Sequence, residues 1–270
     1  MGFNSQDDLI NEITSNGKFI EWNFRKYHPA ALEGAGVWHS IWKAPGSPGA
    51  GVDPAGTPGT AYDDAAGSMN WTDVDPDTKH SLVLEAVSDV DCVLMVVDRL
   101  VSVGGISMVG TGPKTIDSTA LPRYSGTDAT NVEAWLEVTT AGTGGPPLIT
   151  MNSYTNEAGA TGHAGAQIAL PSTPAVHSMY NFGLQAGDKG IRSVETVNVD
   201  TAGTAGVFNV TLLRPIGWIN LYSNQLNNKD FVNQFASMRR IFDSASLALM
   251  VLASSTTAPN IWGCLSGAYG

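Results

Sequence analysis

Charged side chains are scarce in this sequence of 270 residues. Asp, Glu, Lys and Arg together make up 14% of it, whereas a typical globular domain has about 25%. An isolated globule covers much of its surface with such residues, so we expect a large part of this exterior to be uncharged and to contact other subunits. Basic residues are the scarcer kind, with 14 against 25 acidic residues and a net charge of -11. Because phosphate binding requires clustered Lys and Arg, we expect no nucleic-acid partner.

Cysteines and long hydrophobic runs are also few. The two cysteines, Cys92 and Cys264, are too few for a disulfide framework, and we expect free thiols in the core. Residues 1–20 have neither the basic start nor the apolar stretch of a secretory signal peptide. The longest apolar runs, such as residues 247–253, are shorter than the about 20 residues that cross a bilayer. We therefore expect no membrane partner and synthesis in a cytoplasm.

Apolar residues in the second part of the chain follow the pattern of strands. In residues 132–139 (VEAWLEVT), Leu136 lies on one face while Trp135 and Glu137 lie on the other, which predicts a strand with one wet or interfacial face. Two hairpins are predicted, from residues 81–87 with 92–103 and from 247–253 with 261–269. Further strands are predicted at residues 148–155, 194–199 and 206–213. Short strands separated by turn residues are typical of a mostly β fold, here an antiparallel β-sandwich or a jelly-roll-like barrel.

Two short helices are expected beside the strands. Ser5 is a good helix N-cap, and Asp7 and Asp8 follow in the first turn, where the helix dipole favours anions. Residues 5–20 are therefore predicted to contain a short helix that ends at Gly17. A second, core-facing helix is predicted between residues 227 and 242 because four apolar residues recur there at helical spacing, namely Phe231, Phe235, Met238 and Phe242.

Proline and glycine are concentrated in residues 34–59. This composition excludes a helix or a central strand and predicts an extended arm. The arm also contains tryptophans, so we expect it to lie on its own domain or on a neighbouring subunit. The predicted division is residues 1–70 as N-terminal helix and extended arm, and residues 71–270 as a β-sandwich domain.

Motifs that carry chemistry are hard to find. Asp73, Asp75 and Asp77 resemble the start of a calcium loop, but Pro76 lies inside it and Thr78 stands where the loop requires glycine. The five histidines include no pair at the spacing of a helical zinc site, and no cysteine pair completes one. We expect no catalytic residue, metal or cofactor, and the sequence is interpreted as that of a protein that is not an enzyme.

Tryptophans are the candidate interface residues, because Trp is enriched at interaction hot spots. The predicted set is Trp22, Trp38, Trp42 and Trp135. Trp135 or Trp71 could instead stack on a sugar, which keeps a carbohydrate-binding module as an alternative. Glu133 and Glu137 do not suggest a glycosidase, since they lie about 13 Å apart on a strand and paired catalytic carboxylates lie about 5 to 9.5 Å apart.

Five segments of the sequence resemble virion structural proteins of tailed bacteriophages, most closely capsid decoration or cement proteins. They are residues 38–51 (WHSIWKAPGSPGAG), 121–140 (LPRYSGTDATNVEAWLEVTT), 154–159 (YTNEAG), 213–218 (LRPIGW) and 247–270. The resemblance implies a β-rich protein on the capsid surface of the virion. It also implies binding to the major capsid protein and to copies of itself, as a trimer. A tail or neck component is the alternative within the same class.

Overall fold

A computed structural model of the protein describes residues 3–28, 32–54, 56, 59–116, 119–233 and 238–270. Strands hold 52% of the chain and helices 5%. Every pairing between the named strands of the described residues is antiparallel. The predicted mostly β, antiparallel fold is therefore confirmed.

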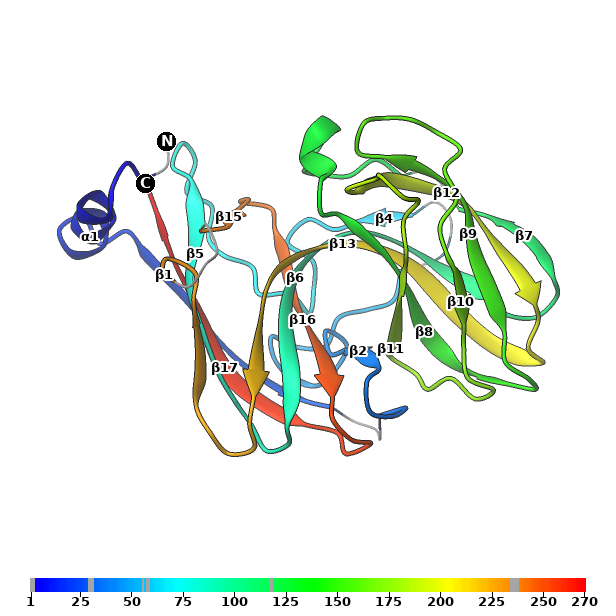
Figure 1. Ribbon diagram of the computed structural model, residues 1–270. Helices are drawn as coiled ribbons and strands as arrows, with labels where there is room; N and C mark the ends of the chain where they lie inside the picture. Colours follow the sequence, from blue (N-terminus) through cyan, green and yellow to red (C-terminus); the bar gives the residue numbers. More distant parts are fainter. Residues whose placement is uncertain (1–2, 29–31, 55, 57–58, 117–118, 234–237) are drawn as a thin grey trace.

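The first sheet, called the β17 sheet, lies at one end of the molecule (Figure 1). Its strand order is β14-β5-β17-β1-β3, and β15 also pairs with β5. The strands are β1 (Phe19–Tyr27), β3 (Gly46–Ser47), β5 (Lys79–Ser88), β14 (Asn227–Asp230), β15 (Arg240–Ile241) and β17 (Asn260–Tyr269). Helix α1 (Gln6–Thr14) packs on this sheet through Leu9, which contacts Leu82 and Ala268.

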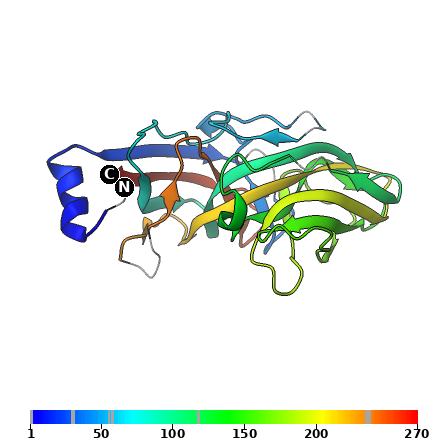
Figure 2. The same ribbon diagram turned by 90° about the horizontal axis from the view of Figure 1, so that it is seen from above.

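The second sheet, called the β9 sheet, lies at the end of the molecule away from α1 (Figure 2). Its strand order is β10-β9-β12-β7. The strands are β7 (Gly112–Thr115), β9 (Leu148–Asn156), β10 (Gln167–Ala169) and β12 (Ile191–Thr201), and the short 3-10 helix η1 spans Gly126–Ala129.

The third sheet lies between the other two and closes on itself. Its order is β13-β8-β11-β2-β16-β6-β4, and β13 also pairs with β6. Six strands, from β13 round to β6, therefore form a closed ring, which we call the ring. The strands of this sheet are β2 (Trp38–Ser40), β4 (Thr60–Ala61), β6 (Cys92–Ser107), β8 (Glu133–Thr143), β11 (Ser178–Phe182), β13 (Ala205–Leu221) and β16 (Ser246–Ala253).

The two longest strands, β6 and β13, hold the molecule together. They pair along almost their whole length, from Ser107 opposite Val207 to Cys92 opposite Leu221. Their outer neighbours differ at the two ends, because β16 pairs with residues 92–99 of β6 and β8 pairs with residues 205–213 of β13. In Figure 1 this ribbon runs through the middle, with the β17 sheet on one side and the β9 sheet on the other.

Three apolar cores follow from this arrangement. On β6, Leu94 and Val96 belong to the core shared with the β17 sheet, whereas Met95 and Val97 belong to a cluster drawn from the ring strands. Successive side chains of a strand point to opposite faces, so this cluster fills the inside of the ring. Its buried members are Trp42, Met95, Val97, Trp135, Met179, Leu213, Ala248 and Met250. The third core lies between the ring and the β9 sheet.

The two predicted hairpins are wrong, although the strands themselves are present. β5 and β17 belong to the β17 sheet, whereas β6 and β16 belong to the ring. Each short connection therefore passes from one layer to another. Residues that favour turns at the first connection bind neighbouring loops instead of closing a hairpin: Asp89 accepts a hydrogen bond from the Asn260 backbone at 2.7 Å, and Asp91 accepts one from the Ser223 backbone at 2.7 Å.

The first predicted helix is confirmed and the second is wrong for the described residues. The Ser5 side chain caps α1 by accepting a hydrogen bond from the Asp8 backbone. The second segment instead begins as β14 and ends near β15, both paired with β5, and residues 234–237 lie outside the described part. The Asp230 carboxylate accepts hydrogen bonds from the backbones of Val232 and Asn233, which favours a turn over a helix. No helix of the described residues is long and apolar enough to span a membrane.

The N-terminal segment predicted as helix and extended arm, residues 1–70, contributes strands to two sheets. β1 pairs with β17 over nine residues, from Phe19 to Tyr27, and β2 lies in the ring between β11 and β16. β3 lies at the edge of the β17 sheet, next to β1. The first 70 residues therefore do not form a unit separate from residues 71–270. The prediction that the segment lies on its own chain holds for these strands.

Candidate functional site

A groove opens at the ring and is lined by three tryptophans from three of its strands. They are Trp38 of β2, Trp135 of β8 and Trp218 of β13, and the groove has a volume of about 540 Å³. The rings of Trp38 and Trp135 meet edge to face, with centroids 6.4 Å apart. Trp218 is 62% exposed, whereas Trp135 is only 6% exposed. We call this the tryptophan groove.

Polar side chains border the tryptophan groove. Glu133 accepts hydrogen bonds from Trp135 Nε1 at 2.8 Å and from Asn181 Nδ2 at 3.1 Å, both on its Oε2 atom. Burial raises the pKa of the Glu133 carboxyl, and the Trp135 hydrogen bond opposes this. Asn131 and Asn220 also line the groove. The groove thus combines aromatic faces with amide and carboxyl groups.

A shallow apolar groove adjoins the tryptophan groove at the end of β13. It has a volume of about 280 Å³, and Val93 and Asn220 line both grooves. Most of its wall is apolar and is made by residues that include Cys92, Val93, Leu221, Tyr222, Leu252 and Ala253. Asp91, Asn220 and Ser254 also line it. Tyr222 is 55% exposed and Leu226, four residues along the loop, is 68% exposed. We call Tyr222, Leu226 and this groove the apolar end.

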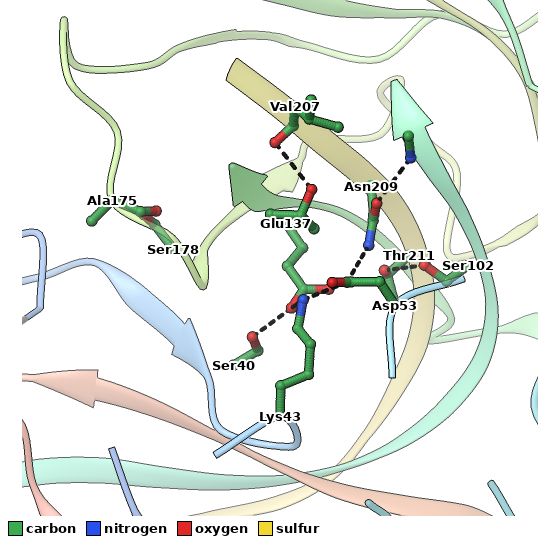
Figure 3. A network of polar contacts seen from close by, with 12 residues as sticks. Ser40, Lys43, Asp53, Ser102, Glu137, Ala175, Ser178, Val207, Asn209 and Thr211 are labelled. Carbon is green, nitrogen blue, oxygen red and sulfur yellow. Dashed lines mark hydrogen bonds and ion pairs between the residues drawn. The ribbon is translucent and has the colours of Figure 1, made fainter. Parts of the chain in front are cut away.

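A buried network of charges lies where residues 40–53 meet the ring (Figure 3). Lys43 lies between two carboxylates, 2.9 Å from Glu137 and 2.5 Å from Asp53. Glu137 also accepts a hydrogen bond from the Ser40 hydroxyl at 2.6 Å, and Asp53 accepts one from Asn209 Nδ2 at 3.1 Å. Burial alone would lower the pKa of Lys43, but Glu137 and Asp53 raise it above its usual value. The network therefore fixes the predicted arm to the ring.

The four predicted interface tryptophans lie in different surroundings. Trp38 and Trp135 share the tryptophan groove. Trp22 is half-buried against the core of the β17 sheet. Trp42 is only 1% exposed, beneath the Arg99 guanidinium at 4.6 Å. An intersubunit role remains a prediction for all four residues, and the half-buried side chains of Trp22 and Trp38 offer it the most surface.

Two expectations for exposed tryptophans are wrong. Trp135 was expected on a wet or interfacial face of its strand; at 6% exposure this face is not wet, and the interfacial alternative stays a prediction. Trp71 is 4% exposed and packs in the core beside the β17 sheet, so it cannot act as a stacking platform. The exposed tryptophan is Trp218, which the sequence analysis did not select. Residues two apart on a strand share a face, and Ile216 is buried, so alternation along the strand does not predict that Trp218 is exposed.

Residues with catalytic or metal-binding potential are held in structural roles. Asp77 of the suspected calcium loop pairs with Lys18 at 2.9 Å. Within the described residues, no group of three or more His, Cys, Asp or Glu side chains could hold a metal ion. Burial raises the pKa values of Cys92 and Cys264 to about 11, so neither thiol is a nucleophile at neutral pH.

Three histidines that are far apart in the sequence lie together. His28 is 5.9 Å from both His39 and His177, measured between ring centroids. His39 Nε2 accepts a hydrogen bond from the Glu33 backbone, so its Nδ1 donates to the Val37 carbonyl. Burial, followed by the neighbouring His28, lowers the pKa of His39 to about 4. This arrangement holds His39 neutral at physiological pH.

The fold and the two grooves must be interpreted from their own chemistry. Comparison of the chain with protein-family models, curated protein sequences and solved structures finds no match to any of them.

Proposed function

We propose that this chain is a non-enzymatic virion structural protein. In this proposal it decorates and stabilises a phage capsid by binding the outer surface of the major capsid protein shell and neighbouring copies of itself. The apolar end carries the proposal, because it offers an uncovered apolar contact surface on a chain with few charged side chains.

The composition of the apolar end supports a protein partner. Tyr222 and Leu226 are two of seven large hydrophobic side chains that are exposed in the described residues, and Tyr222 also lines a groove with mostly apolar walls. Aromatic residues are enriched and charged residues are depleted at the centres of protein interfaces. Covering such side chains removes apolar area from water and stabilises the complex.

The interior supports a structural role rather than catalysis. Glu137 and Lys43, which are ionisable and buried, satisfy each other, and Asp98 accepts hydrogen bonds from Arg123 and Tyr124. Such pairing stabilises one conformation of the interior. A rigid body with an apolar contact surface suits a protein that reinforces a shell.

Co-sedimentation with capsids that lack this chain tests the proposal. The Leu226→Asp variant places a charge at the apolar end, and we expect it to weaken shell binding by about tenfold or more, since a buried unpaired charge is costly at an interface. Val109→Asp is the matched control, because Val109 is also exposed but lies after β6 at the other end of the β6–β13 ribbon. Equal binding by both variants and the natural chain would reject the apolar end as the contact.

Native mass spectrometry of the purified protein tests self-association. A trimer agrees with decoration of a capsid lattice. Rings of about six copies that bind purified tails instead of shells would assign the chain to the tail or neck, where rings of subunits are closed by rotational symmetry.

A further inference from the structure

A second pocket adjoins the tryptophan groove and gathers three arginines. Arg214, Arg239 and Arg240 line it, and its volume is about 460 Å³. Asn131, Ile216 and Arg239 line both this pocket and the tryptophan groove. The two hollows therefore form one continuous groove with an arginine part and a tryptophan part.

The charge of the arginine part is opposite to that of the protein. The net charge of the chain is -11, yet three of its seven arginines line this one pocket. Among the described residues none of the three is ion-paired with a carboxylate, and Asp128 is the acidic residue of the lining. The Nε atom of Arg239 is buried and has no hydrogen-bond partner in the described part. Buried donors are normally satisfied, so this N–H group can donate to an acceptor on a bound ligand.

Aromatic rings hold two of the arginines in place. The Arg214 guanidinium lies 4.3 Å from the centroid of the Tyr124 ring, and that of Arg240 lies 4.3 Å from the Phe242 ring. The two rings themselves meet edge to face with centroids 4.8 Å apart. Stacking occupies the face of a guanidinium and leaves the N–H groups at its edge available. The pocket thus presents donors suited to bidentate binding of a carboxylate, sulfate or phosphate group.

The tryptophan part suits the rings of a sugar. The exposed indole of Trp218 offers a flat apolar surface to the C–H face of a pyranose, with Trp38 beside the same groove. Sugar hydroxyls require polar partners. Asn220 lines this part. Both hydrogen bonds that the Glu133 carboxyl accepts from described residues end on Oε2, which leaves Oε1 for a ligand. A few polar groups on an apolar wall are the usual composition of a small-molecule site.

We propose that this continuous groove binds an acidic oligosaccharide. Its sugar rings stack on Trp218 and Trp38, and its anionic group binds to Arg214, Arg239 and Arg240. A neutral glycan would leave the arginines unpaired. A nucleic acid is disfavoured because it carries a phosphate at every unit, whereas Arg239, shared with the arginine part, is the basic side chain among the described residues that line the tryptophan part. This inference goes beyond attachment to a shell, since the apolar end is a neighbouring surface that shares only Val93 and Asn220 with the tryptophan part.

A glycan array that includes uronate, sialylated, sulfated and phosphorylated oligosaccharides tests the proposal with the full chain. We expect binding to acidic members. Neutral oligosaccharides of the same length should bind at least about tenfold more weakly. Calorimetry with the strongest acidic member should show weaker affinity at high salt, because salt screens charge pairs. An array on which no acidic member binds would overturn the proposal, as would tighter binding of a single-stranded oligonucleotide or an acidic peptide.

Variants locate the binding. Arg214→Met and Trp218→Ala should each weaken affinity for that oligosaccharide by about tenfold or more. Arg25→Met is the matched control, because the Arg25 guanidinium also stacks on an aromatic ring, 4.7 Å from Tyr27, but lies in the β17 sheet. If Arg214→Met fails to fold, Arg240→Met replaces it, since Arg240 is exposed. Equal affinities for all variants would refute the site.

The Leu226→Asp variant separates this proposal from the proposed function. It should bind the oligosaccharide as the natural chain does while it binds shells more weakly. Loss of glycan binding in this variant would contradict the assignment of the two activities to two surfaces.

Discussion

Replacing Glu137 by Gln tests whether the buried charge network holds the N-terminal segment in place. The substitution keeps the shape of the side chain but removes its charge from a site where the Glu137 side chain is 3% exposed and that of Lys43 is 9% exposed. Lys43 would then have only Asp53, whose side chain is 49% exposed. Breaking a buried ion pair costs about 3 to 5 kcal/mol. Because Asp53 still compensates part of the charge, we expect a loss of about 3 kcal/mol in the free energy of unfolding.

Equilibrium unfolding in urea measures this loss. Trp42 and Trp135 lie inside the ring, so tryptophan fluorescence follows the unfolding of that region. In the double variant Glu137→Gln/Lys43→Met no charge is left unpaired in the buried part of the network, and we expect it to be about 2 kcal/mol more stable than Glu137→Gln alone. A Glu137→Gln variant within about 0.5 kcal/mol of the natural chain, which is the range of ordinary surface substitutions, would refute the reasoning.

Three further outcomes are expected. Lowering the pKa of His39 from 6.5 to about 4 means that the unfolded chain takes up a proton that the folded chain rejects. The folded state is therefore most stable above pH 6.5, and its free energy of unfolding falls by about 3 kcal/mol by pH 4. Urea unfolding at several pH values measures this loss, and His39→Gln should remove it. Gly217→Ala should lower the free energy of unfolding by about 1 to 3 kcal/mol in thermal unfolding, because the added Cβ would lie 2.3 Å from the Phe231 ring. Gly49→Ala is the control and should change little, because no atom lies within 4 Å of its added Cβ. Deleting residues 1–27 should give a chain without cooperative unfolding, since β17 loses the nine-residue ladder with β1. Deleting residues 1–17 should leave the sheets folded. Near-UV circular dichroism distinguishes the two outcomes.

Local patterns in the sequence were enough to find most strands. The alternation of residues 132–139 predicted β8, and the continuous apolar run of residues 92–103 predicted β6. The run is continuous because β6 packs on both faces, inside the ring and against the other sheets. The same patterns could not assign partners, because alternation shows which side chains share a face and not which strand lies beside them. This is why both hairpins were wrong.

Long-range pairing also explains what was missed in the N-terminal segment and the site. The three residues of β2 form a strand because β11 and β16 supply its hydrogen bonds, and no local signal in a Pro/Gly-rich segment shows this. Arg239 lies in the segment predicted to be a helix between residues 227 and 242, whereas the chain folds it into a pocket with Arg214 from β13. Only the folded chain brings these residues together, so the groove could not be predicted from spacing.

A reconstruction of the virion at subnanometre resolution tests the central claim most directly. We expect density of this mostly β shape on the outer surface of the shell, with the end that carries Tyr222 and Leu226 against the major capsid protein. Density for the chain in the tail or neck, or on the shell with this end facing solvent, would contradict the account.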